Sequence, residues 1–162
     1  MAGGIRKKFL HAKVIVHRAK KTVRRLFSPP KPDFQFKINK SSITAHLETV
    51  TVPAYFGHVF KPDAKVLQLH VESISGRDII TLLNRLKKEV PRFRMIGISG
   101  MYGDTPNSAI VKKFIQTFNA NVLSPPQDRR QLVQNLYFQK VASEGYSSKY
   151  LNQPAVRVIV NF

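Results

Sequence analysis

The feature that most constrains the organisation of this chain is the uneven distribution of its charge. Residues 1–32 contain ten Lys and Arg and no acid, and Asp33 is the first acidic residue. The other 130 residues carry 17 basic and 9 acidic side chains, so more than half of the net charge of +18 lies in the first fifth of the chain. Such asymmetry is typical of a basic arm joined to a folded body.

The arm has the apolar spacing of an amphipathic helix. Its apolar residues recur at intervals of three and four, which places them on one helical stripe. The stripe consists of Ile5, Phe9, Ala12, Val16, Ala19, Val23 and Leu26. The cations outside the stripe are Arg6, Lys7, Lys8, Lys13, Arg18, Lys20, Lys21, Arg24 and Arg25.

A helix of this kind suits an anionic membrane surface. We predict that Ile5, Phe9, Val16, Val23 and Leu26 form its membrane-inserting face. The nine cations would then bind the phosphates of lipid or RNA, each contributing about 1 kcal/mol near such a surface. Two other interpretations stay open. The arm also resembles a cleaved mitochondrial presequence, with residues 24–28 as the processing site, and it could be a solvated tail or a helix docked on its own domain.

A proline-rich segment separates the arm from the body. Residues 28–32 include Pro29, Pro30 and Pro32, which interrupt any helix and favour an extended backbone. The sequence therefore predicts a stiff linker, with residues 1–32 as arm and linker and residues 33–162 as one globular domain. The same segment could instead be a docking peptide for an aromatic-lined groove.

The body has the pattern of a compact α+β domain. Apolar and polar residues alternate over 34–38, 42–52 and 65–72, and apolar residues dominate 93–98 and 155–162, so we expect strands there. A helix should begin after Ser75 or Asp78 and end at Pro91. Further helices are expected from Asn107 or Ser108 onward and over residues 129–141. We predict a mostly antiparallel sheet with about three helices. The residues expected to face inward from the helices are Ile79, Leu82, Leu83, Leu86, Val90, Ile110, Phe114, Ile115, Phe118, Leu132, Val133, Leu136 and Tyr137.

Patterns that could support catalysis are weak. Residues 97–103 contain three glycines at intervals of three, which match no phosphate-binding loop and predict a tight turn. The five histidines lack metal-ligand spacing and the chain has no cysteine. His70 and Glu72 share a strand face, and an enzyme would have to use such a pair or Ser99. We predict no enzymatic activity, no metal and no cofactor.

A second basic patch could bind nucleic acid. It comprises Arg85, Lys87, Lys88, Arg92 and Arg94, beside Phe93. Cations of this kind neutralise phosphates without sequence preference. Lys112, Lys113, Arg129 and Arg130 add two further pairs. Single-stranded RNA would also need aromatic stacking, for which Phe34 and Phe36 are candidates, although strand phenylalanines are more often core residues.

The order of these features resembles that of a rhabdovirus matrix protein. The resemblance covers the basic arm at 5–27, the proline stretch at 29–32, the strand at 67–71, the helix to Val90, the segment 91–100, and the terminal strand ending in Phe162. It lies in the arrangement of features and not in identity. The proline stretch lacks the tyrosine of a P-P-x-Y budding motif, and the short chain points to a plant-infecting type.

The resemblance implies a structural protein of the virion that associates with host membranes. Such a protein would bridge the inner surface of an anionic membrane and a ribonucleoprotein, self-associate, and drive condensation and assembly. The alternative is a basic RNA-binding protein, either a silencing suppressor or an organellar ribosomal component imported into the mitochondrion through residues 1–27.

Overall fold

The computed structural model describes residues 31–72 and 75–162. The predictions for the helical arm therefore lie outside the described residues. Apart from Lys31, the described residues belong to a compact unit that spans Pro32–Phe162. Its α+β class, mostly antiparallel sheet and three helices confirm the predicted fold.

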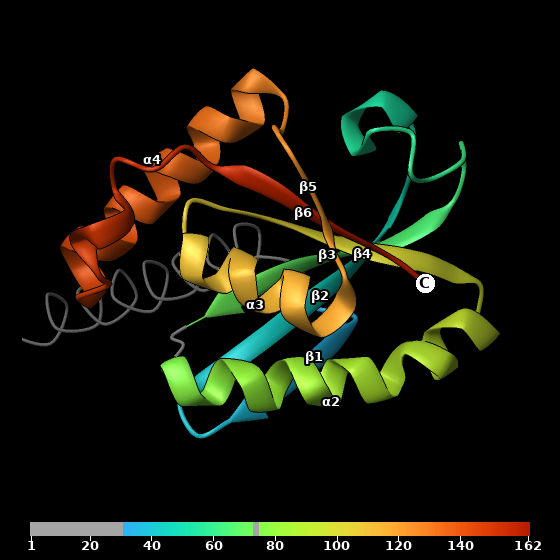
Figure 1. Cartoon of the computed structure of the whole chain (residues 1–162), viewed down its shortest axis with the longest axis horizontal. Coiled ribbons are helices and arrows are strands. Elements are labelled where there is room, and N and C mark those ends of the chain that lie inside the picture. Colours follow the sequence, from blue (N-terminus) through green and yellow to red (C-terminus); the bar gives the residue numbers. More distant parts are fainter. Residues whose placement is uncertain (1–30, 73–74) are drawn as a thin grey trace, which may run out of the picture. The chain divides into compact units, whose positions relative to one another are not determined.

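The described residues form six strands, three α-helices and two short 3-10 helices (Figure 1). The strands are β1 (Phe34–Ile38), β2 (Ser41–Thr49), β3 (Lys65–Glu72), β4 (Ile98–Thr105), β5 (Asn121–Leu123) and β6 (Val156–Asn161). The helices are α2 (Gly76–Met95), α3 (Ser108–Phe118) and α4 (Gln127–Glu144), with η1 (Pro53–Phe56) and η2 (Ser148–Tyr150). The strand order in the sheet is β1-β2-β3-β4-β6-β5.

Only one pair of neighbouring strands in this sheet is parallel. β3 and β4 run in the same direction because α2 crosses over between them, whereas the other neighbours are antiparallel. A parallel pair requires a crossover connection of this length. The carboxyl ends of β3 and β4 therefore lie at the same edge of the sheet.

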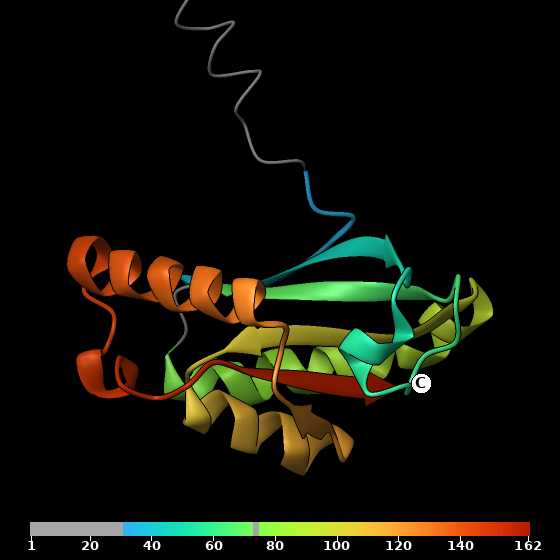
Figure 2. The same ribbon diagram turned by 90° about the horizontal axis from the view of Figure 1, so that it is seen from above.

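The sheet separates two hydrophobic cores. α2 and α3 cover one face, and α4 lies on the other (Figure 2). The first core includes Leu67, Leu69, Leu82, Leu86 and Met101, which are buried between the sheet and the two helices. The second core includes Phe56, Phe60, Val66, Tyr102 and Ile159. The alternation of β3 places its odd-numbered apolar residues in one core and Val66 in the other.

The helix α2 is longer than the sequence predicts. It continues through Pro91 to Met95, so the predicted stop at Pro91 and the predicted strand at 93–98 are both wrong. The physical reason is that the apolar spacing continues from Leu86 through Val90 to Phe93, and the Phe93 side chain is buried in the first core. Burial of this aromatic ring outweighs the loss of one helical hydrogen bond.

The glycine-rich segment forms a strand and not the predicted tight turn. Only Gly97 has a left-handed backbone, with φ of +80°, and β4 begins at the next residue. Gly100 lies inside β4, where an added Cβ would be 2.4 Å from the Val160 carbonyl oxygen and 2.5 Å from the Phe60 ring. These glycines allow close packing and do not form a loop.

Three residues predicted to face inward are exposed instead. They are Ile115 of α3 and Leu132 and Leu136 of α4. In α4 only Tyr137 is buried, so this helix turns a single side chain fully toward the body. The short strand β5 was not predicted, since three residues are too few to show a period.

Candidate functional site

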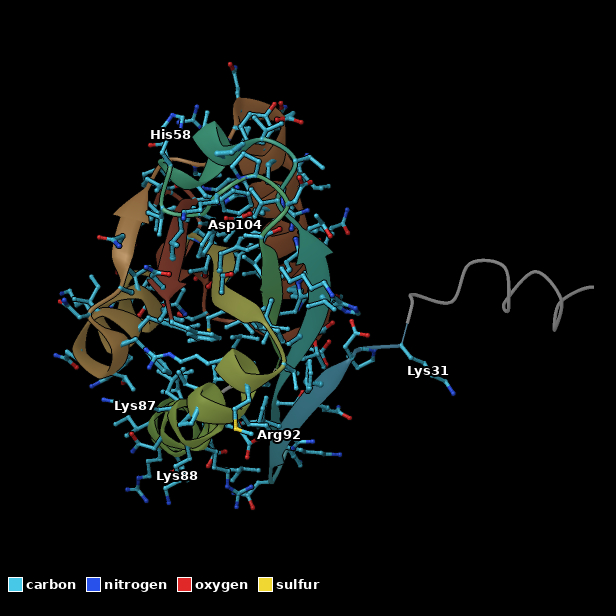
Figure 3. All side chains as sticks on the ribbon, turned by 90° about the vertical axis from the view of Figure 1, so that its right-hand side faces the viewer. Lys31, His58, Lys87, Lys88, Arg92 and Asp104 are labelled. Carbon is cyan, nitrogen blue, oxygen red and sulfur yellow. The ribbon has the colours of Figure 1, made fainter. Side chains whose placement is uncertain are left out.

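The predicted basic patch lies on the second half of α2, but its cations point in different directions. In Figure 3, Lys87 lies toward the α3 side, Lys88 points away from the sheet and Arg92 lies toward β1. Lys87 Nζ donates to the Thr117 carbonyl oxygen at 2.8 Å, and Arg85 Nη1 donates to the Lys37 carbonyl oxygen at 3.3 Å. These two cations therefore also tie α2 to its neighbours.

The remaining cations of the patch are more available to a partner. Arg92 pairs with Glu89 at 3.5 Å, and its side chain is 73% exposed. Exposed pairs of this kind are weak, at about 0–1 kcal/mol, so a polyanion can compete for Arg92. Lys88 and Arg94 are exposed as well.

Basic charge is concentrated on one side of the sheet. α2 and α3 together carry eight Lys and Arg and only two acids, Asp78 and Glu89, a net charge of +6. On the opposite side, α4 carries three cations and two acids, a net charge of +1. Hydrogen bonds from Ser75 and Ser41 lower the pKa of Asp78, which is held at the start of α2. The α2–α3 side is therefore a basic surface, to which Lys112 and Lys113 contribute.

The two candidate stacking phenylalanines pack against the core. Phe34 lies edge-on to Phe93, with 5.0 Å between ring centroids. Phe36 packs against the same core cluster. Neither ring is presented as an open platform for a base, so the basic surface consists of cations without the aromatic partners that base stacking requires.

The opposite face of the sheet holds an ion-pair network that the sequence did not reveal. Asp104 of β4 accepts from Arg157 Nε at 2.7 Å and Nη2 at 2.8 Å, and from Arg129 Nε of α4 at 3.1 Å. The Arg157 guanidinium lies over the rings of Phe56 and Tyr102 and is 4% exposed as a residue. Burial alone would lower the pKa of Arg157, but the bonds and charge of Asp104 outweigh it and raise that pKa.

The predicted pair of His70 and Glu72 is not joined by a hydrogen bond. His70 contacts the Gln68 amide at 3.2 Å, while Glu72 accepts from Ser42 at 3.5 Å. The His70 ring reaches solvent, yet desolvation lowers its pKa, as do the neighbouring charges of His46 and Arg129. Beside it, burial and a bond to Glu48 raise the pKa of Tyr102. The bonds of Glu72 and Tyr102 therefore join β2 to β3 and to β4.

A cavity of about 1050 Å³ lies at the carboxyl ends of β3 and β4. It reaches the first turns of α2 and α3 and the underside of α4. Helix starts attract anions through free N–H groups. Here Asn107 Oδ1 accepts from the N–H groups of Ala109 and Ile110, and Ser75 Oγ accepts from that of Asp78. The caps therefore occupy several of the donors that an anion would need.

The described residues include neither a metal-binding cluster nor a membrane-spanning helix. Among residues 31–72 and 75–162, no cluster of three or more His, Asp or Glu is arranged to hold a metal ion. No helix in the described part of the chain is long and apolar enough to cross a membrane.

The arm residues predicted to bind lipid or RNA lie outside the described part, so the predicted polyanion site that can be located in space is the basic patch on α2, which forms part of the α2–α3 basic surface. The cavity and the Asp104 network come from residues far apart in sequence, and no spacing signalled them. Comparisons of the chain with protein-family models, curated proteins and solved structures found no significant match.

Proposed function

We propose that this protein is a non-enzymatic structural protein of the viral matrix type, which bridges an anionic membrane surface and a ribonucleoprotein and drives their assembly. The basic arm would bind the membrane, and the α2–α3 basic surface would bind RNA phosphates. The observation that carries the proposal is the net charge of +6 on the α2–α3 side against +1 on α4.

The physical basis is the release of counterions. Each phosphate that a Lys or Arg neutralises frees condensed cations, so affinity falls steeply with salt and depends little on sequence. Arg77 and Lys88 are exposed and lie eleven residues apart on α2, which is three helical turns. They therefore point outward along one line, spaced about 16 Å apart, and can contact two separate, non-adjacent phosphates of one polymer.

A second function rests on the same surface. Because the α2–α3 cations belong to the body and not to the arm, they would serve a dedicated RNA-binding protein equally well. That protein would be a silencing suppressor or an organellar ribosomal component whose arm is a presequence. The two functions differ in what the arm binds.

Vesicle flotation separates the two functions. The full chain and a deletion of residues 1–27 are floated with phosphatidylcholine vesicles and with vesicles that also contain 30% phosphatidylserine. We expect the full chain to bind only the anionic vesicles and the deletion to lose most of this binding, because nine cations and the apolar stripe are removed. Anionic binding that is equal in both chains would contradict the membrane role of the arm.

RNA binding tests the basic surface. Arg77→Gln with Lys88→Gln removes two outward cations, and Lys61→Gln with Lys149→Gln removes two exposed cations outside this surface. Affinity for a single-stranded RNA is measured by fluorescence anisotropy from 50 to 300 mM salt. The affinity falls as salt rises, and only the first variant should make this dependence less steep. The slope of log affinity against log salt should become less negative by about 1.4 if both contacts are lost. Equal slopes in the two variants would contradict the assignment.

A further inference from the structure

The last turn of α2 exposes two consecutive large apolar residues. Met95 is 86% exposed and Ile96 is 54% exposed, and Met95 is the most exposed of the large hydrophobic residues in the described chain. Gly97 then turns the chain into β4. We refer to Arg92, Arg94, Met95 and Ile96 as the α2 tip. Isolated exposed apolar residues are ordinary, but an adjacent pair at a protruding helix end suits a binding surface.

The charge around this apolar pair is mostly basic. Arg92 and Arg94 lie in the same turn, and Lys88 lies one to two turns before it. Glu89 is the only acid of α2 beyond Asp78. An apolar pair next to guanidinium groups matches the boundary between phospholipid headgroups and acyl chains, where apolar groups insert and cations meet phosphates.

The α2 tip lies at the end of the sheet where the arm joins the body. Phe34, the first residue of β1, contacts Phe93 of the last turn of α2 at 5.0 Å between ring centroids. The ring of Phe162 stacks on the same Phe93 at 5.9 Å. Asp33, which follows the linker, accepts from the backbone N–H of Leu47 at 2.7 Å and so fixes the entry of the chain at this end.

We propose that the α2 tip is a second membrane contact, in which Met95 and Ile96 insert between acidic phospholipids while Arg92 and Arg94 bind their phosphates. The inference deepens the proposed function, because it assigns the membrane a surface on the body as well as the arm. Stable membrane attachment generally needs two weak signals acting together. Since the arm joins the body beside the tip, binding of one raises the effective concentration of the other at the same membrane.

Full-length variants test the tip by vesicle flotation. Met95→Ser with Ile96→Ser removes the apolar pair, and Arg92→Gln with Arg94→Gln removes the two cations. Each should weaken binding to anionic vesicles about tenfold, since it removes inserted apolar area or two phosphate contacts. Ile80→Ser, at an exposed position in the first half of α2, and Lys40→Gln with Lys149→Gln, which removes two exposed cations outside the α2 tip, are the matched controls and should bind vesicles like the unaltered chain.

A fluorescent reporter tests insertion directly. The chain contains no tryptophan, so Met95→Trp places a single one at the tip. Its emission should shift to shorter wavelength with anionic vesicles and stay unchanged with RNA. Phe138→Trp, at an exposed position on α4, is the control and should not shift with either.

The outcomes separate this inference from the proposed function. In one outcome, arm deletion abolishes vesicle binding while the Met95→Ser/Ile96→Ser variant binds normally. This result overturns the membrane role of the α2 tip and supports that of the arm. Weakened vesicle binding by the tip variant, with no effect of arm deletion, supports the tip and contradicts the arm. A tip variant that loses RNA affinity but keeps vesicle binding shows an RNA contact and overturns the inference. Failure of the full chain to bind anionic vesicles overturns both this inference and the membrane role in the proposed function.

Discussion

At the scale of single residues, Gly100 shows how closely the strands and the second core approach each other. Its Cα faces both the backbone of β6 and the ring of Phe60, and the space for a Cβ is already filled. Backbone cannot move aside as the end of a flexible side chain can. The position therefore requires glycine for packing, although its backbone is not left-handed.

We predict that Gly100→Ala lowers the free energy of unfolding by about 1–3 kcal/mol, the usual cost of overpacking a core. Gly76→Ala is the control, because an added Cβ there meets nothing within 4 Å and Gly76 opens a helix. Urea unfolding followed by circular dichroism measures both. Equal stability of Gly100→Ala and the unaltered chain would mean that β4 and Phe60 can separate without cost.

The Asp104 network is a second example at this scale. Arg157 is a buried charge that Asp104 neutralises with two hydrogen bonds, while the Tyr55 carbonyl oxygen accepts a third at 2.9 Å. A buried ion pair of this kind contributes little net stability, but loss of either partner leaves an uncompensated charge. The network therefore specifies how α4 and η1 are placed against the sheet.

At the scale of elements, α2 contains a conflict between local preference and tertiary packing. Pro91 has no N–H and cannot donate to the Lys87 carbonyl, which the helical pattern would require. The helix nevertheless continues, because Phe93, two residues later, packs between Phe34 and Phe162. The axis of α2 changes direction in its last turns (Figure 1), as expected near an internal proline.

We expect Pro91→Ala to raise the free energy of unfolding by about 1–3 kcal/mol, since it restores a helical hydrogen bond and removes a steric clash. Thr81→Ala, at an exposed position of the same helix, is the control and should gain only a few tenths of a kcal/mol. The urea midpoints of the two variants are compared with that of the unaltered chain, with the same dependence of the unfolding free energy on urea concentration assumed for all three. A gain at Pro91 no larger than that at Thr81 would show that the proline is already well accommodated.

At the scale of the whole molecule, the two sides of the sheet have different characters. The α2–α3 side combines a large apolar core with a basic exterior, and the α4 side combines a smaller core with a buried ion-pair network and a cavity. The described body contains its own core residues and its own sheet. Its stability should therefore not depend on residues 1–27.

We predict that a chain lacking residues 1–27 unfolds with a free energy within about 0.5 kcal/mol of the full chain, as for a surface change remote from the core. Urea unfolding at high salt, where screening weakens surface charge effects, makes the comparison. A loss of more than about 1 kcal/mol would instead show that the apolar stripe of the arm packs against the body.

The local periodicity of the sequence determined many of the secondary-structure elements of this protein. The alternation over 65–72 predicts β3 to the residue, and α3 begins where the sequence predicts, with Asn107 as its cap and Ser108 as its first residue. Charge is also a property of sequence, so the basic residues of α2 could be listed without a structure. The directions in which these side chains point could not be predicted, because they depend on which face of α2 packs against the sheet.

Tertiary structure decided the features that join distant residues. Phe93 extended α2 past a proline because its partners lie 59 positions earlier and 69 later in the chain. Gly100 became part of a strand because Phe60 and Val160 fill the space beside it. The exposed tip at Met95 and Ile96 followed from that longer helix. Periodicity reports only the local preference of the backbone, whereas long-range burial contributes enough free energy to override it.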